Sequence, residues 1–184
     1  MFLLRHGQSY FNLHFGATRV DPGIEDPELT ALGKSQAHAA AQTLAGVPLT
    51  RIIVSPYTRA LQTAEPIVAT HRVPVEIMHE VRERAAFTCD IGCAPPILAS
   101  RFPHHDFAHL PMQWWPDGVE TPASTVARAN GFRALMAARD DAAMTLLVSH
   151  WAFILALTGN SLTNGEIVEY DPRTTAPDDL VWDY

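Results

Sequence analysis

The sequence has 184 residues, of which 47% are hydrophobic and 18% are charged. This length and composition are typical of one globular domain that folds by itself, and they exclude a disordered chain. The net charge of −7, with Lys and Arg scattered along the chain, argues against nucleic acid or an anionic membrane as a partner. No apolar run reaches the ~20 residues that span a bilayer, and no leader precedes the first apolar residues, so we expect a cytoplasmic protein.

The N-terminal half predicts strands that alternate with helices. Thr30 can cap a helix whose apolar residues recur at helical spacing as far as Leu44. Ser55 followed by Pro56 is a second helix-start signal, because Ser caps helices and Pro is tolerated at the first helical position. Short apolar runs predict strands at residues 1–4, 51–54 and 74–78.

The C-terminal half continues this alternation. Thr121 and Pro122 repeat the start signal before a helix that extends toward Arg139. Residues 144–148 are almost purely apolar, which is typical of a central strand covered on both faces. We also expect a helix at residues 151–157 and edge strands at residues 166–170 and 180–184.

This order predicts an α/β fold, a three-layer sandwich in which helices flank a mainly parallel central sheet. We expect a single domain over residues 1–184. Residues 84–119 break the rhythm, because they are rich in Pro and His and show only one short helical pattern, near residues 97–101. This segment is too long for a simple connection, so we predict a cap or lid insertion over a site.

Two histidines are predicted to meet at one edge of the sheet. His6 and His150 each follow a predicted buried strand, and ligands gather at the carboxyl ends of parallel strands. Arg5 adjoins the first of them. Arg59 lies in the first turn of a predicted helix, where a cation meets the positive end of the helix dipole. An anion between these side chains would explain that unfavourable placement.

Two arginines and two histidines around one point indicate a pocket for a dianionic phosphoryl group. A neutral imidazole can attack phosphorus, and a second, cationic one can stabilise the charge that builds on the oxygens. The leaving oxygen also needs a proton donor. Glu83 and Glu80 both lie just beyond the third predicted strand, and either carboxyl group could serve.

The sequence resembles a known family, the histidine phosphatase superfamily (branch 1), also called phosphoglycerate-mutase-like. Residues 4–12, LRHGQSYFN, resemble its RHGxSxxN signature. Three further segments match its motifs in order: residues 29–37 its LTxxGxxQA segment, residues 55–64 its SPxxRAxQTA helix, and residues 148–150 its VSH motif. The four ordered motifs extend along most of the chain, and together they are far more specific than RHG alone.

The resemblance implies a phosphoglycerate-mutase-like fold, a small phosphorylated substrate and chemistry that needs no metal or cofactor. It implies that His6 is the nucleophile that becomes phosphohistidine, and that Glu83, at the family's LxE position, is the general acid. Glu80 is the alternative acid. The residues expected to bind phosphate are Arg5, Asn12, Arg59 and His150, the last also serving in catalysis.

One position departs from the family pattern. The last motif usually continues as His-Gly, whereas this chain has Trp151 after His150. We expect a phosphatase that hydrolyses a phosphomonoester. The alternatives are a mutase of the phosphoglycerate type, which we rank second because such enzymes tend to be longer, and a phospho-ligand binding protein with little turnover, which Trp151 motivates.

A few remaining features are given simpler explanations. Cys89, His104, His105 and His109 match no standard zinc spacing, so we expect no metal site. Trp114 and Trp115 are expected to pack within the cap. The apolar strand predicted at residues 180–184 could pair with a second copy, so a homo-oligomer is compatible with the sequence.

Overall fold

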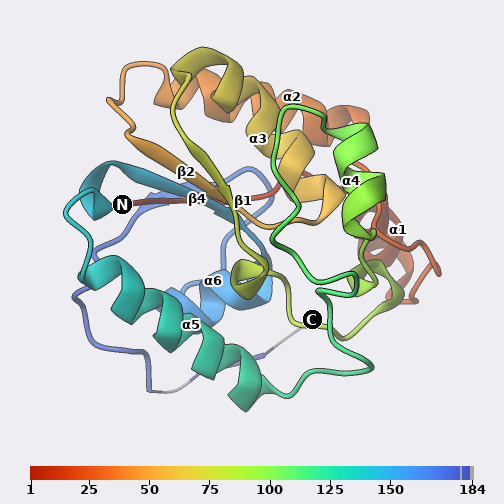
Figure 1. The fold of residues 1–184 in the computed structure, drawn as a ribbon. Coiled ribbons are helices and arrows are strands. Elements are labelled where there is room, and N and C mark those ends of the chain that lie inside the picture. The colour runs from red at the N-terminus through yellow and green to blue at the C-terminus, as the bar shows by residue number, and fades with distance from the viewer. Residues whose placement is uncertain (179, 183–184) are drawn as a thin grey trace.

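The computed structural model describes residues 1–178 and 180–182, and it shows a five-stranded sheet between two layers of helices (Figure 1). The strands follow the order β3-β2-β4-β1-β5, and every neighbouring pair is parallel except β1 with β5. Their bounds are Phe2–Arg5 for β1, Arg51–Val54 for β2, Val75–Ile77 for β3, Thr145–Ser149 for β4 and Ile167–Glu169 for β5. The predicted α/β sandwich with a mainly parallel sheet is confirmed.

Helices cover both faces of the sheet. In Figure 1, α2 and α3 lie over one face and α5 and α6 over the other. The helices are α1 (Tyr10–Thr18), α2 (Ala31–Leu44), α3 (Thr58–His71), α4 (Pro95–Arg101), α5 (Pro122–Ala137) and α6 (Trp151–Thr158). Short 3₁₀ turns cover His79–Val81 (η1), Thr88–Asp90 (η2) and Ala142–Met144 (η3).

Alternating residues of the central strands divide the core into two apolar clusters. Leu4 and Val148 belong to the cluster that packs under α2 and α3, whereas Leu3 and Leu147 belong to the one under α5 and α6. All four side chains are fully buried. Because β1 and β4 are covered on both faces, they consist of nearly continuous apolar runs, as parallel strands usually do.

The start of α3 differs from the prediction. The helix begins at Thr58 rather than at Ser55, because the Ser55 hydroxyl bonds to His150 Nε2 at 2.7 Å and does not cap the helix. A carboxylate distant in the sequence caps the helix instead. Asp26 accepts hydrogen bonds from the Thr58 backbone N–H at 2.9 Å and from its hydroxyl at 2.6 Å.

Helix α1 was not predicted. Ser9 and Asn12 form a capping box at its start, but Phe11 is its only buried residue, so the sequence shows no apolar stripe. The predicted edge strand at residues 180–184 is wrong where it can be judged. Leu180 and Trp182 pack against the core cluster under α5 and α6, in backbone with no regular structure. Asp183 and Tyr184 lie outside the described residues.

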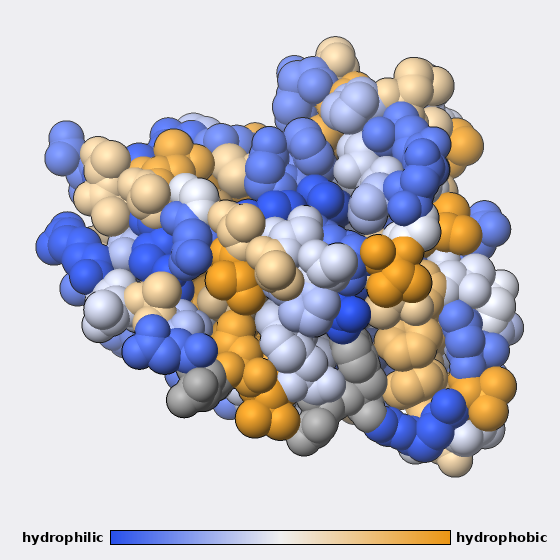
Figure 2. Space-filling view, turned by 90° about the horizontal axis from the view of Figure 1, so that it is seen from below, coloured by the Kyte–Doolittle hydropathy of each residue, from blue (hydrophilic) through white to orange (hydrophobic). Residues whose placement is uncertain are grey.

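The predicted cap segment, residues 84–119, packs largely into the protein. Its apolar side chains join the core cluster under α2 and α3, namely Leu98, Phe102, Phe107, Leu110 and Trp114. Exposed apolar residues are dispersed, and on the face in Figure 2 hydrophobic patches are divided by hydrophilic residues. Within residues 1–178 and 180–182, no helix is both long enough and apolar enough to cross a membrane.

Candidate active site

Adjacent parallel strands bring the two predicted histidines together. Arg5 and Ser149 are partners in the β1 and β4 register, so His6 and His150 follow these strands at the same edge of the sheet. The His6 backbone N–H donates to the Ser149 carbonyl at 3.0 Å. The two imidazole ring centroids lie 5.0 Å apart.

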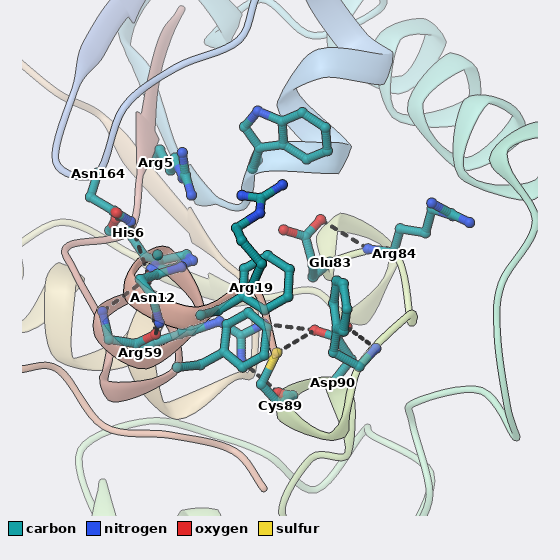
Figure 3. Close-up of a pocket in the computed structure, with 16 residues that line it drawn as sticks. Arg5, His6, Asn12, Arg19, Arg59, Glu83, Arg84, Cys89, Asp90 and Asn164 are labelled. Carbon is teal, nitrogen blue, oxygen red and sulfur yellow. Dashed lines mark hydrogen bonds and ion pairs between the residues drawn. The ribbon is translucent and has the colours of Figure 1, made fainter. Parts of the chain in front are cut away.

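A cavity of about 260 Å³ opens beside His6. Five predicted site residues line it, namely Arg5, His6, Asn12, Arg59 and Glu83, whereas His150 is fully buried next to His6. Figure 3 shows the side chains of these five lining residues around the cavity. The remaining lining residues are Ser9, Phe11, Phe15, Gly16, Arg19, Arg84, Phe87, Cys89, Asp90, Trp151 and Asn164.

His6 is held in one tautomer. Its Nδ1 lies 2.7 Å from the Gly7 carbonyl oxygen, and a carbonyl can only accept, so Nδ1 carries the proton. Nε2 therefore keeps its lone pair. Burial, together with the charges of Arg59 and Arg5, lowers the pKa of His6 well below its ordinary value. The imidazole is neutral and can act as a nucleophile.

Two buried nitrogen atoms of this site have no hydrogen-bond partner among the described residues. They are Arg5 Nε and His150 Nδ1. Another nitrogen of each side chain is engaged, because Arg5 Nη1 donates to the Leu162 carbonyl at 2.6 Å and His150 Nε2 bonds to Ser55. Buried polar atoms are rarely left unpaired, so their presence beside His6 suits a bound anion.

The second imidazole differs from our expectation. Burial, followed by the charges of Arg59, His6 and Arg5, lowers the pKa of His150 well below its ordinary value. The ring is therefore neutral in the site without an anion, whereas we expected it to be cationic. A bound phosphoryl dianion would favour its protonation, because an opposite charge nearby stabilises the imidazolium.

Arg59 has a buried partner that the sequence did not reveal. Its guanidinium donates to the Cys89 carbonyl at 2.7 Å and forms an ion pair with Asp90 at 3.0 Å. The other Asp90 oxygen accepts from the backbone N–H groups of Ala86 and Phe87, at 3.0 and 3.1 Å. Burial raises the pKa of Asp90, although Arg59 opposes this shift.

Glu83 and Glu80 are separated by the structure. Glu83 lines the cavity, and its Oε1 accepts from the backbone N–H groups of Arg84 and Ala152, both at 2.9 Å. Burial and the charge of Asp90 raise the pKa of Glu83 to about 7, against the effect of Arg59. Glu80 is 54% exposed, pairs with His79 at 3.5 Å and does not line the cavity.

Asn12 both caps helix α1 and lines the cavity. Its Oδ1 accepts from the Ser9 backbone N–H and hydroxyl, both at 3.0 Å, and from Asn164 Nδ2 at 3.3 Å. Asn164 also donates to the His6 carbonyl at 3.0 Å. Asn164 was not predicted from the sequence, because it lies in an irregular segment far from every motif.

A close backbone contact fixes the loop after His6. A Cβ atom on Gly33 would lie 2.1 Å from the Gln8 carbonyl oxygen, and one on Gly7 would lie 2.5 Å from that of Gly33. The Gly7 backbone N–H also donates to the Thr63 hydroxyl at 3.0 Å. The two glycines thus allow the start of α2 to pack directly against the loop that carries His6.

The sequence matches a known protein family over most of its length. Residues 1–172 match the histidine phosphatase superfamily (branch 1). The chain belongs to this superfamily. Relatives of this histidine phosphatase chain include an uncharacterized protein of Mycobacterium tuberculosis, MT0547, which is 31% identical over 182 residues, covering 93% of this chain and 81% of that protein. The probable phosphoglycerate mutase GpmB of Yersinia enterocolitica is 42% identical over only 67 residues, 36% of this chain and 29% of GpmB.

Solved structures of other proteins share the histidine phosphatase fold. A mycobacterial glucosyl-3-phosphoglycerate phosphatase in complex with VO3 has a TM-score of 0.63 at 24% identity and covers 91% of this chain and 88% of its own. The ecdysone phosphate phosphatase of Bombix mori, in complex with tungstate, has a TM-score of 0.68 at 15% identity and covers 100% and 96%. At these identities the likeness shows a common fold.

The position that departs from the histidine phosphatase pattern lies at the cavity. Trp151 is half-buried among the lining residues, and its Nε1 donates to the Ser161 hydroxyl at 2.7 Å. The next backbone N–H, of Ala152, is the group that binds Glu83. The large side chain thus narrows one side of the cavity while the backbone beside it remains available to position the carboxyl group.

Three of the four residues weighed for a metal site are engaged separately. His105 Nε2 lies 2.8 Å from the Glu65 carboxylate, and His109 Nε2 lies 2.7 Å from the Ile77 carbonyl oxygen. Cys89 is buried beside Asp90. Trp114 packs against Tyr57, with ring centroids 4.7 Å apart, and belongs to the core.

Proposed function

We propose that this chain is a phosphatase that hydrolyses a small phosphomonoester through a phosphohistidine on His6. The observation that carries the proposal is a pair of buried nitrogens, Arg5 Nε and His150 Nδ1, that find no hydrogen-bond partner in the described part of the chain, beside an imidazole whose Nε2 keeps its lone pair. This arrangement supplies a nucleophile and donors for phosphoryl oxygens in one place.

In the first step, the substrate phosphoryl group binds between Arg5, Arg59 and His150. The lone pair on His6 Nε2 forms a bond to phosphorus while the bond from phosphorus to the ester oxygen breaks. Glu83, whose pKa of about 7 keeps much of it protonated near neutral pH, gives its proton to the departing oxygen, so that an alcohol leaves. Asn12 assists in holding the phosphoryl group.

In the second step, water attacks the phosphorus of phosphohistidine. Glu83 is now a carboxylate and accepts a proton from that water, while the bond between phosphorus and Nε2 breaks. Inorganic phosphate leaves, His6 is again neutral and Glu83 is again protonated. The Gly7 carbonyl holds the proton on Nδ1 in both steps, which stabilises the cationic phosphoimidazole.

The test is hydrolysis of 4-nitrophenyl phosphate by the wild type and His6→Ala. We expect the variant to lose at least about 10³-fold in kcat, because the covalent route is closed. His38→Ala is the matched control, since His38 is exposed on α2 and does not line the cavity. Equal rates for the wild type and His6→Ala would reject the proposal.

The short match to GpmB supports a mutase as the second candidate. A mutase would return the phosphoryl group from His6 to another oxygen of the same substrate, so the intermediate would have to stay enclosed. Product analysis with 3-phosphoglycerate separates the two activities. Phosphate release faster than isomer formation supports the phosphatase, and the reverse order supports the mutase.

Trp151 is the observation that favours the third candidate, a phospho-ligand binding protein with little turnover. The indole lines the cavity where the family usually has a small residue. Trp151→Gly tests it directly. A large rise in kcat in this variant, from a wild-type rate near background, would support the binding protein, whereas efficient turnover by the wild type rejects it.

A further inference from the structure

Three phenylalanine rings form one wall of the cavity. Phe11 and Phe15 come from α1, and their ring centroids lie 5.1 Å apart in a stacked arrangement. Phe87, from the loop before η2, lies 5.3 Å from Phe11 and 4.9 Å from Phe15. All three line the cavity. We refer to Phe11, Phe15 and Phe87 as the aromatic wall.

The aromatic wall is tied to the phosphate side of the site by one carboxylate. Asp90 bonds through Oδ1 to Arg59 and through Oδ2 to the backbone N–H of Phe87. The Tyr57 hydroxyl donates to the Asp90 carbonyl oxygen at 2.5 Å, which fixes this residue further. The position of Phe87 relative to Arg59 is therefore set by buried contacts, and the Phe11 and Phe15 rings pack against Phe87.

A cation extends the wall toward the mouth of the cavity. Arg19 caps α1 in a left-handed conformation, and its backbone N–H donates to the Phe15 carbonyl at 2.8 Å. Its guanidinium lies 4.9 Å from the centroid of the Phe15 ring. In Figure 3 the Arg19 side chain reaches toward the same space as Glu83. A guanidinium stacked on a ring offers a further flat face to a planar ligand.

Three polar side chains near this wall are already hydrogen-bonded to one another. Ser9, Asn12 and Asn164 form one cluster around Asn12 Oδ1. A polyhydroxylated leaving group placed against the three rings would lose its water without gaining equivalent hydrogen bonds from the rings or from this cluster, which is unfavourable. A flat apolar group would instead gain contact area and ring-to-ring contacts.

We propose that the leaving group of the substrate is aromatic, with one or two rings, and that it binds against the aromatic wall while its phosphate reaches His6. The inference deepens the proposed phosphatase function and rests on it. A cavity of about 260 Å³ lies near the lower end of the ~300–1,000 Å³ typical of small-molecule sites. It suits a phosphate with a compact ring system better than a large conjugate.

The test compares two esters whose leaving groups are both primary alcohols, 2-(2-naphthyl)ethyl phosphate and glycerol 3-phosphate. Their intrinsic reactivities are similar, so the ratio of their kcat/KM values reports recognition of the leaving group. We expect the wild type to prefer the naphthyl ester by at least about tenfold. Phe15→Ala and Phe87→Ala should each reduce this ratio severalfold, with Phe15→Leu in between.

Leu13→Ala is the matched control, because Leu13 lies on the same helix, is 46% exposed and does not line the cavity. Its ratio should equal that of the wild type. A wild-type ratio near one, or equal losses on both esters in the Phe variants, would overturn the proposal.

Failure of the proposed phosphatase function is distinguishable from failure of this inference. If the wild type hydrolyses neither ester, the same ratio is measured as Kd values by calorimetry on His6→Ala, which keeps the aromatic wall. Tighter binding of the naphthyl ester that is lost in the His6→Ala, Phe15→Ala double variant supports an aromatic ligand. Equal Kd values reject it.

Discussion

Asp90 Oδ1 lies 3.0 Å from Arg59 Nη2, and the two side chains are only 2% and 3% exposed. Part of the positive charge of Arg59 is therefore already balanced by Asp90. A phosphoryl dianion must share this guanidinium with a carboxylate, whereas Arg5 Nε offers an unpartnered donor. The pair supplies a buried cation with a counter-charge, and we expect it to limit how tightly a product phosphate binds.

Asp90→Asn tests this balance through stability and phosphate affinity together. Removing the carboxylate leaves Arg59 buried without a counter-charge, so we expect the free energy of unfolding to fall by about 3 kcal/mol in buffer without phosphate. Inorganic phosphate should bind about tenfold more tightly, because the repelling charge is gone. Thermal unfolding at increasing phosphate concentrations measures both. Weaker phosphate binding in the variant would contradict this account of Asp90.

The pH dependence of kcat/KM should follow Glu83. Its pKa is raised to about 7, and the first step needs the protonated form, so the rate should be highest below this pH and fall as pH rises through it. His6, with a pKa held well below its ordinary value, should stay neutral and keep the rate from falling at the mildly acidic pH at which a free histidine is already protonated. A pH series on an alkyl phosphate checks both limits.

The control for that series is Glu83→Gln, in which Gln can still accept the hydrogen bonds from the backbone N–H groups of Arg84 and Ala152. The variant should lose about 10²- to 10⁴-fold in rate with alkyl esters, together with the fall above pH 7. A fall that persists unchanged in Glu83→Gln would assign it to another group.

Arg128 should position the general acid from outside the cavity. It donates to the backbone carbonyls of Arg82 at 3.1 Å and Glu83 at 3.4 Å, and it forms an ion pair with the buried Glu120 at 2.7 Å. We expect Arg128→Ala to lower the free energy of unfolding by about 3 kcal/mol, because Glu120 loses its closest partner.

In Arg128→Ala, kcat should also fall more than KM rises, and the pH limit attributed to Glu83 should shift. Arg128→Lys should restore stability better than activity, because a lysine cannot reach several acceptors in one plane. A loss of stability with an unchanged pH profile would show that Arg128 has only a structural role.

Gly33 should be indispensable because of the space around it. A methyl group there would meet the Gln8 carbonyl oxygen at 2.1 Å, and this oxygen belongs to the backbone, which cannot easily give way. Gly33→Ala should therefore cost about 3 kcal/mol or more and displace the loop that carries His6. Gly131→Ala, on an open face of α5, is the control and should be neutral or slightly stabilising. Thermal unfolding compares them.

Periodic and motif-bearing parts of the fold were predictable from the sequence. The strands that end at His6 and His150 consist of nearly continuous apolar residues, so their burial and their common edge could be expected. The helix starting at Thr121 and Pro122 was confirmed because its cap is local, with the Thr121 hydroxyl accepting from the Ser124 backbone N–H.

Contacts between distant segments could not be predicted. Asp26 caps α3 across 32 positions, and Asp90 reaches Arg59 across 31, neither with any spacing that a pattern could reveal. Likewise, α1 is stabilised by its capping box and by ring contacts with Phe87 rather than by an apolar stripe. A strand was expected at residues 180–184 because most residues there are apolar. Leu180 and Trp182 instead pack against the core cluster in irregular backbone, and the sequence pattern cannot distinguish this packing from a strand.

The most direct test of the central claim is the detection of phosphohistidine on His6. The wild type and Glu83→Gln are mixed with 4-nitrophenyl phosphate, quenched in alkali within milliseconds to seconds, and digested for mass spectrometry. We expect an acid-labile, alkali-stable phosphate on the peptide that contains His6. It should accumulate more in Glu83→Gln, since this leaving group needs little protonation but the water step needs the carboxylate. Phosphate release without any phosphorylated His6 in either protein would contradict the account.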